Sequence, residues 1–192
     1  MSVALRPMAA GDRDQVLAWR NSPEVAGYMY TEGTISAEAH ARWFAATLAS
    51  PDRRYWIIEA DGTGVGVAAL TWIEPENRRC EWAYYLGDPA TRGRGIGTAV
   101  EYIVIEEVFG PMGLNKIACE VLVENEAVWR LHESFGFMRE AFYRDHVLKA
   151  GVFRDVMGLS LLARDWPAAR PAALERLRAK GYDPAGLRIV AS

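Results

Sequence analysis

The chain has 192 residues, of which 51% are hydrophobic and 24% charged, the balance of a globular protein with one full core. A formal net charge of -3 argues against nucleic acid as the main partner, since phosphate binding favours a basic excess. No apolar run approaches a membrane span, and the N-terminus lacks a secretory pattern. We therefore expect a cytoplasmic protein that binds neither membranes nor nucleic acid. Cys80 and Cys119 lie in apolar alternating runs and should be buried free thiols; no spacing suggests a metal site.

The first half of the chain combines short β-rich runs with two helical patterns. Residues 3–6 alternate like a strand, residues 12–20 carry a helical stripe, and residues 21–33 read as a loop. Ser36 has the character of an N-cap for a second helix. Residues 55–59 and 64–72 are β-rich, and Asp61-Gly62 between them predicts a hairpin turn.

The second half continues the alternation. Strands are predicted at residues 79–86, 116–124, 142–148 and 155–161, and helices at residues 97–109 and 126–135. This order predicts an α/β fold in which helices flank a mixed sheet of about seven strands. Residues 166–192 contain three prolines and a short helical segment, so they read as a C-terminal helical appendage to a domain of residues 1–165.

Residues 92–97, with the sequence Arg-Gly-Arg-Gly-Ile-Gly, join a predicted strand to a predicted helix. Glycines let the backbone approach a ligand closely, and the helix N-terminus offers free N–H groups and a positive dipole end. With Arg92 and Arg94 as counter-charges, this loop predicts a diphosphate site. A dinucleotide-binding βαβ unit is disfavoured because three antiparallel strands precede the loop. A P-loop is disfavoured because no lysine precedes Thr98.

Two segments resemble the GNAT family of N-acetyltransferases. Residues 92–97 match its Arg/Gln-x-x-Gly-x-Gly/Ala signature, and residues 125–137 resemble its Asn-x-x-Ala-x-x-Leu-Tyr-x-x-x-Gly-Phe pattern. The resemblance implies a GNAT fold whose fourth and fifth strands splay apart around the pantetheine arm of acetyl-CoA. It implies cofactor contacts from Leu86, Arg92, Gly93, Arg94, Gly95, Ile96, Gly97, Thr98 and Asn125.

Acetyl transfer from a thioester to an amine needs a proton acceptor for the amine and a proton donor for the thiolate. The family's usual donor is a tyrosine, and His132 stands at that position. It is predicted either to donate the proton or to pack, with Tyr84, Tyr85 and Tyr143 as substitutes. Glu81 and Glu120 interrupt apolar strands, so they are candidate bases or structural ion pairs. No cysteine suggests a covalent intermediate, so we expect direct transfer in a ternary complex.

The acceptor-binding residues are expected mainly in the N-terminal half. An arginine, a histidine and aromatic residues suit a flat anionic ligand. The pattern resembles the GNAT branch of the pseudaminic acid pathway, which serves flagellin glycosylation and acetylates the 4-amino group of a UDP-linked 4-amino-4,6-dideoxy sugar. That resemblance implies nucleotide contacts from Arg20 and His40, and a sugar pocket of Met29, Tyr30, Trp43 and Tyr84 or Tyr85.

Other acceptors and roles stay open at the level of sequence. One alternative is a ribosomal-protein or peptide N-terminal acetyltransferase, and another is a polyamine acetyltransferase, which would need an acidic acceptor pocket. A third is a non-catalytic acyl-CoA-binding sensor. Exposed apolar residues on the last strands, together with the habit of the family, suggest a homodimer.

Overall fold

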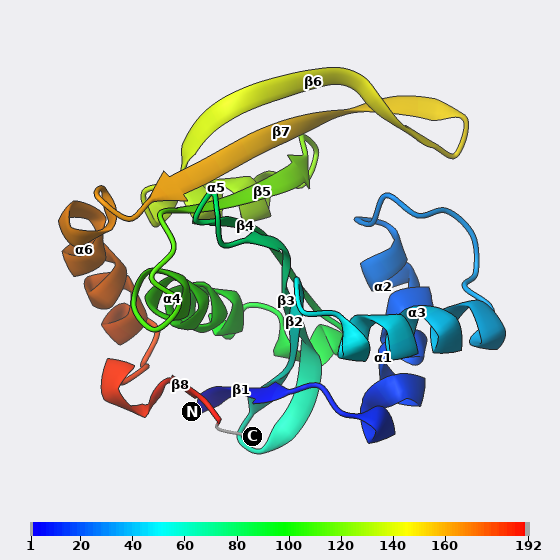
Figure 1. Ribbon diagram of the computed structural model, residues 1–192, viewed down its shortest axis with the longest axis horizontal. Coiled ribbons are helices and arrows are strands. Elements are labelled where there is room, and N and C mark those ends of the chain that lie inside the picture. The colour runs from blue at the N-terminus through cyan, green and yellow to red at the C-terminus, as the bar shows by residue number, and fades with distance from the viewer. Residues whose placement is uncertain (1, 191–192) are drawn as a thin grey trace.

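The computed structural model describes residues 2–190, which form one eight-stranded mixed sheet (Figure 1). Its strands run in the order β6-β7-β5-β4-β3-β2-β1-β8. Their bounds are β1 Val3–Pro7, β2 Arg54–Ala60, β3 Thr63–Glu74, β4 Arg79–Leu86, β5 Lys116–Leu122, β6 Met138–Lys149, β7 Val152–Leu162 and β8 Arg188–Ile189. Neighbours are antiparallel except for β4 with β5 and β1 with β8, which are parallel.

Helices cover both faces of this sheet (Figure 1). On one face lie α1 (Arg13–Asn21), α2 (Pro23–Ala26) and α3 (Ala37–Ala49). On the other lie α4 (Ile96–Phe109), α5 (Glu126–Ser134) and α6 (Trp166–Ala179). Short 3₁₀ turns η1 (Ala10–Asp12), η2 (Pro89–Thr91) and η3 (Pro184–Gly186) complete the chain. The prediction of a mixed α/β GNAT-type sheet flanked by helices is confirmed.

Each face has its own apolar core. The larger core joins the sheet to α4, α5 and α6, and α4 is so deeply buried that ten of its residues are inaccessible. The smaller core lies under α1 and α3 and consists of Met8, Val16, Trp19, Phe44, Ile57 and Val67. Sheet residues therefore alternate between two buried environments, which explains the nearly continuous apolar character of β3.

Local signals in the sequence account for several boundaries. Ser36 is the N-cap of α3, and its hydroxyl accepts a hydrogen bond from the Ala39 N–H at 3.2 Å. Asp61 and Gly62 both have positive φ (50° and 79°), as a tight turn between β2 and β3 requires. Two expectations were wrong in detail. Residues 23–26 form the short helix α2 inside the predicted loop, and β6 and β7 are longer than the runs predicted.

The segment after residue 165 packs on the sheet domain. Within α6, Ala173 and Leu177 are fully buried in the larger core, and Tyr182 beyond it is 2% exposed. Residues 188–189 add β8, the eighth strand that the sequence did not predict, because two residues are too few for a periodic pattern. The segment therefore contributes to the core and to the edge of the sheet.

Two features of the structure concern the predictions about partners, namely a membrane and a second copy of the chain. Among the described residues, no helix is long and apolar enough to cross a membrane. Large apolar side chains are exposed along β6 and β7, namely Met138, Phe142, Leu148, Val152 and Phe153. A homodimer through this surface stays a prediction.

The burial of α6 predicts that the C-terminal segment supports folding. Leu177→Ala should lower the free energy of unfolding by about 2–5 kcal/mol, because it removes a fully buried side chain from the larger core. Leu48→Ala is the matched control, since Leu48 in α3 is 44% exposed. Urea denaturation of both variants measures the difference. Equal, small effects would show that α6 is a dispensable appendage.

Candidate active site

The parallel strands β4 and β5 pair only at their N-terminal ends. Their register joins Arg79 with Lys116, Cys80 with Ile117 and Glu81 with Ala118, and no pairing between them is found beyond Glu81 in the described chain. After that point the two strands diverge, and we call this opening the fork. On its outer side, β4 remains paired with β3, and β5 remains paired with β7. The backbone edges inside the fork are therefore available to amide groups of a ligand, as the predicted splay requires.

The glycine-rich loop lies between β4 and α4. Gly93 and Gly95 have φ of 75° and 74°, and Gly95 is the N-cap of α4. A Cβ on Gly97 would lie 2.6 Å from the Tyr84 hydroxyl. The loop is thus a cradle that side chains would fill, at the positive end of a fourteen-residue helix. This geometry fits the diphosphate of a CoA ester.

The other predicted cofactor residues surround this loop and the fork. Ile96 is 1% exposed and Thr98 6%, so Ile96 can offer a ligand only its backbone N–H. Arg94 forms an ion pair with Asp61 at 3.3 Å, and Arg92 is exposed. Leu86 ends β4, and Asn125 is the N-cap of α5. Their contacts with the cofactor stay predictions.

The C-terminal segment supports the same loop. The Tyr182 hydroxyl donates to the Arg94 carbonyl oxygen at 2.9 Å. The side chain of Lys180 lies 3.1 Å from the position that a Cβ on Gly95 would occupy. The C-terminal segment therefore contacts the glycine-rich loop as well as filling part of the larger core.

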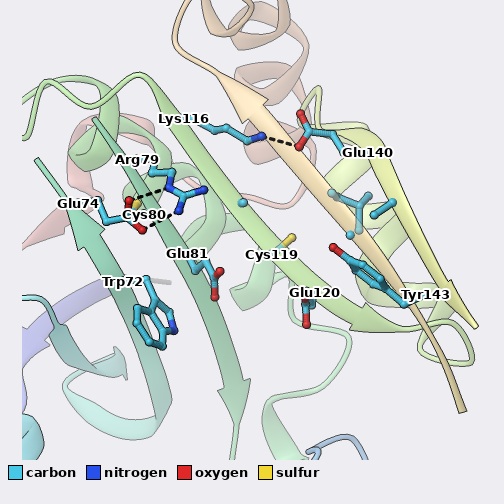
Figure 2. A pocket seen from close by; sticks show the side chains of 14 residues that line it. Trp72, Glu74, Arg79, Cys80, Glu81, Lys116, Cys119, Glu120, Glu140 and Tyr143 are labelled. Carbon is cyan, nitrogen blue, oxygen red and sulfur yellow. Dashed lines mark hydrogen bonds and ion pairs between the residues drawn. The ribbon is translucent and has the colours of Figure 1, made fainter. Parts of the chain in front are cut away.

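A pocket of about 180 Å³ opens at the fork on the sheet face that carries α1 to α3 (Figure 2). Trp72 and Tyr143 stand at its two sides, and the absent side chain of Gly158 leaves room beneath Tyr143. Its wall carries four carboxylates. Two are neutralised, since Arg79 pairs with Glu74 at 2.7 Å and Lys116 with Glu140 at 2.5 Å.

Glu81 and Glu120 are the other two carboxylates, and Figure 2 shows both pointing into the space between Trp72 and Tyr143. Across residues 2–190, neither forms an ion pair. The Tyr30 hydroxyl donates to Glu120 Oε2 at 3.0 Å. Burial, reinforced by the charge of Glu120, raises the pKa of Glu81. Together Glu81 and Glu120 form a pair of carboxylates without a cationic partner in the described residues, which is suited to binding a cation.

The loop that carries Tyr30 is fixed by the tip of the β6–β7 hairpin. Lys149 Nζ donates to the carbonyl oxygens of Ala26 and Met29, the first at 2.7 Å. The Ala150 N–H donates to the Glu32 carboxylate. His146 stacks on Tyr143 with ring centroids 4.8 Å apart. The hairpin thus closes one side of the pocket and positions Tyr30 beside Glu120.

His132 lies behind the fork, on the face that carries α4. Its ring is 3% exposed and packs edge-on against Trp82 at a centroid distance of 5.2 Å. Trp82 and Cys119 are the first residues of the two strands beyond their last paired positions, and both face this side. His132 Nδ1 is 2.9 Å from Oε1 of Glu101, which is fully buried in α4. The predicted acid and the predicted bases therefore occupy opposite sides of one opening.

The residues predicted to bind a nucleotide form a separate cluster away from the pocket. Arg20 lies over the Tyr85 ring with its guanidinium carbon 6.0 Å from the centroid, and Trp43 packs edge-on against Tyr55. His40 is 2% exposed, and neither ring nitrogen has a hydrogen-bond partner among the described residues. Its i,i+3 spacing with Trp43 reflects packing on the smaller core, so His40 presents almost no surface to a nucleotide.

Tyr84 also differs from the expectation for the acceptor site. It turns to the opposite face from Tyr85 and stacks on Trp82 at 5.5 Å. Of the predicted sugar-pocket residues, Tyr30 is the one that the structure brings to the carboxylate pair. Trp72, Lys149 and Glu101 were missed by sequence reasoning. Glu101 could have been found, because it is a single glutamate within the apolar run 99–105.

The parted strands, the phosphate cradle and the adjoining amine-sized pocket define a transferase that uses a CoA ester. Residues 2–138 match the Acetyltransferase (GNAT) domain family, so the chain belongs to that family. It is an acetyl-CoA-dependent N-acetyltransferase. Within the described residues, no cluster of His, Cys, Asp and Glu could hold a metal ion.

Three relatives show the range of similar proteins. YdaF of Bacillus subtilis (strain 168), named as a candidate ribosomal N-acetyltransferase, is 32% identical over 106 residues, which are 55% of this chain and 57% of YdaF. The spermidine N(1)-acetyltransferase of Escherichia coli (strain K12) is 23% identical over 87% of this chain and 89% of its own length. The crystal structure of the Vibrio cholerae spermidine N-acetyltransferase with CoA and spermine has a TM-score of 0.81 at 22% identity, covering 86% of this chain and 98% of that one.

The cradle geometry predicts a specific effect of Gly95→Ala. An alanine there must adopt a positive φ beside Lys180, which costs roughly 1 kcal/mol or more. The KM for acetyl-CoA should therefore rise about fivefold or more, with a smaller change in kcat. Gly11→Ala is the control, because a Cβ at Gly11 meets nothing within 4 Å. An unchanged KM in Gly95→Ala would place the phosphates elsewhere.

The buried, unpartnered His40 predicts a pH-dependent stability. Burial, followed by the charges of Arg13 and Arg20, lowers its pKa in the folded state. The unfolded chain takes up this proton near pH 6.5, so the contribution of His40 to the free energy of unfolding should fall from pH 7.5 to 5.5, by at most about 1.4 kcal/mol per pH unit. His40→Leu should remove that component in urea denaturation, whereas the surface variant His146→Gln should keep it. The same slope in His40→Leu and wild type would contradict this assignment.

Proposed function

We propose that the protein acetylates a primary amine at the end of a polyamine of the spermidine type. The observation that carries this proposal is the uncompensated carboxylate pair of Glu81 and Glu120 at the fork. Two neighbouring carboxylates attract an alkylammonium group, whose positive charge neither has to share with a cationic side chain of the described residues. The similarity to spermidine acetyltransferases in sequence and in fold supports the same acceptor class.

The size and charge of the pocket argue against the nucleotide sugar that the sequence favoured. Its volume of about 180 Å³ is below the ~300–1,000 Å³ of typical small-molecule sites and suits a slender alkyl chain. A UDP group carries negative charge, which Glu81 and Glu120 would repel. Arg20, the cation expected at the nucleotide, does not line this pocket.

The residues divide the transfer into a proton-accepting side and a proton-donating side. Acetyl-CoA supplies the acetyl group as a thioester. Glu120 and Glu81 hold the acceptor ammonium and take its proton, directly or through water, which frees the nitrogen lone pair. Tyr30 orients the Glu120 carboxylate by its 3.0 Å hydrogen bond. Burial and then the charge of Glu120 raise the pKa of the Tyr30 hydroxyl, so the hydroxyl stays protonated and donates this bond. His132, behind the fork, supplies a proton for the departing sulfur.

Thiol release from acetyl-CoA, measured against three acceptors, tests the acceptor class. Spermidine should give the highest kcat/KM, above a peptide N-terminus and a UDP-linked 4-amino-4,6-dideoxy sugar. Glu120→Gln should raise the KM for spermidine about tenfold, because a charged hydrogen bond contributes ~1.5–3 kcal/mol, and should leave the KM for acetyl-CoA nearly unchanged.

Glu124→Gln is the matched control. Glu124 follows the same strand but pairs with Arg154 outside the pocket, so the KM for spermidine should not change. Turnover of the peptide together with none of spermidine would overturn the polyamine proposal in favour of the ribosomal-protein or peptide alternative. No thiol release with any amine, in a protein that binds CoA, would favour a sensor.

A further inference from the structure

Glu101 is the one ionisable carboxylate among the ten buried residues of α4, and its side chain has no exposed surface. Its Oε1 accepts from His132 Nδ1, whereas its Oε2 is buried without a hydrogen-bond partner in residues 2–190. Burying a carboxylate is costly, and an ion pair in such a place is seldom the most stable solution for packing. We therefore look for a role of Glu101 beyond linking α4 to α5.

The surroundings of His132 suggest that role. Nδ1 is directed at Glu101, and the ring also has a side-chain hydrogen bond with Cys119 on the β5 wall of the fork. Nε2 lies on the side of the ring away from Nδ1. The walls around it come from both strands of the fork, Trp82 of β4 and Cys119 of β5, and from Phe137 at 5.3 Å. The imidazole thus lies where β4 and β5 separate, on the side away from Glu81 and Glu120.

We propose that Glu101 is a positioning residue, which keeps the His132 imidazole charged and oriented so that Nε2 gives a proton to the departing thiolate. This inference rests on the proposed transfer, but not on which amine accepts the acetyl group. During the reaction the C–S bond breaks and an N–C bond forms. The ammonium loses two protons on the carboxylate side, and the sulfur gains one proton from the His132 imidazolium. Water then returns a proton to the imidazole. One proton is released overall.

Electrostatics agrees with this geometry. Burial alone would discharge the imidazole, but the Glu101 carboxylate outweighs burial and, with Cys119, raises the pKa of His132 to about 10. Burial raises the pKa of the Glu101 carboxyl, and the charges of His132 and of Arg176 from α6 oppose that rise. Two further titratable groups face the pair, Cys119 from β5 and Tyr84 from β4. The carboxylate and imidazole titrate as a unit. We therefore expect the ring to be protonated at neutral pH.

Glu101→Gln tests the proposal, because glutamine keeps the size and the hydrogen bond but removes the charge. The kcat at pH 7.5 should fall at least about tenfold, since general acid catalysis contributes ~10²–10⁴-fold, while the KM for acetyl-CoA stays within about twofold. The alkaline limb of kcat should move to lower pH by more than one unit. Glu106→Gln is the control on the same helix: Glu106 binds Arg170 and Trp166 away from the fork, so kcat should be unchanged.

A second measurement needs no acceptor and no turnover. In ¹⁵N spectra of the free protein, the His132 ring should remain an imidazolium above pH 8, and in Glu101→Gln it should lose that proton at lower pH. The chain has three histidines, so single substitutions assign the signals. A kcat–pH profile of Glu101→Gln that superimposes on wild type, or a neutral His132 at pH 7 in the wild type, would overturn the proposal. If spermidine fails as acceptor, the same profiles are measured with the amine that reacts, so the two failures are distinguishable.

Discussion

The parting of β4 and β5 after three paired residues is the constraint on which the site depends. Each strand is held on its outer side, by β3 and by β7, so the sheet stays continuous while its middle opens. Backbone amides left open inside a sheet must find partners, and an extended ligand with its own amides can supply them. The pantetheine arm of acetyl-CoA is such a ligand. The cradle at Gly93 to Gly97 lies at the far end of β4, so one strand leads from the reacting centre to the diphosphate.

Opening a sheet also connects its two faces, and the chain places different charges on each. In front, Glu81 and Glu120 have no ion-pair partner among the described residues, beside two carboxylates that are already matched to Arg79 and Lys116. Behind, Glu101 and His132 form the buried pair to which we assign the proton for the departing sulfur. Strand alternation is sufficient to produce this division, because Glu81 and Trp82 are consecutive and must face opposite ways. The faces that we propose for the amine and for the thiol are therefore separated by the thickness of a single sheet.

Much of this could be predicted from sequence, but not the acceptor. The glycine loop, the Ser36 cap and the Asp61-Gly62 turn are local signals, whose geometry follows from a few adjacent residues. His40 and Trp43 show the limit of such signals. Their helical spacing is the same whether the shared face points to a ligand or to a core, and the packing of α3 on β2 decides for the core. Long-range partners were equally hidden: Tyr30 and Glu120 are 90 residues apart, and Lys149 lies 120 residues from the Met29 carbonyl that it binds.

The boundary of the family match explains why the donor is easier to assign than the acceptor. Residues 2–138, which match the family, contain the fork, the cradle and His132, to which we assign the donor. Tyr143, Gly158 and Lys149, which shape one side of the acceptor pocket, belong to the β6–β7 hairpin beyond that boundary. The long hairpin is held at its base by the pairing of β7 with β5, and its other strand, β6, is the edge of the sheet in the described residues. Its side chains and tip contacts can therefore change without disturbing the fork. The hairpin thus forms one side of the acceptor pocket, whereas the carboxylates of the proposed acceptor site, Glu81 and Glu120, lie on the strands of the fork.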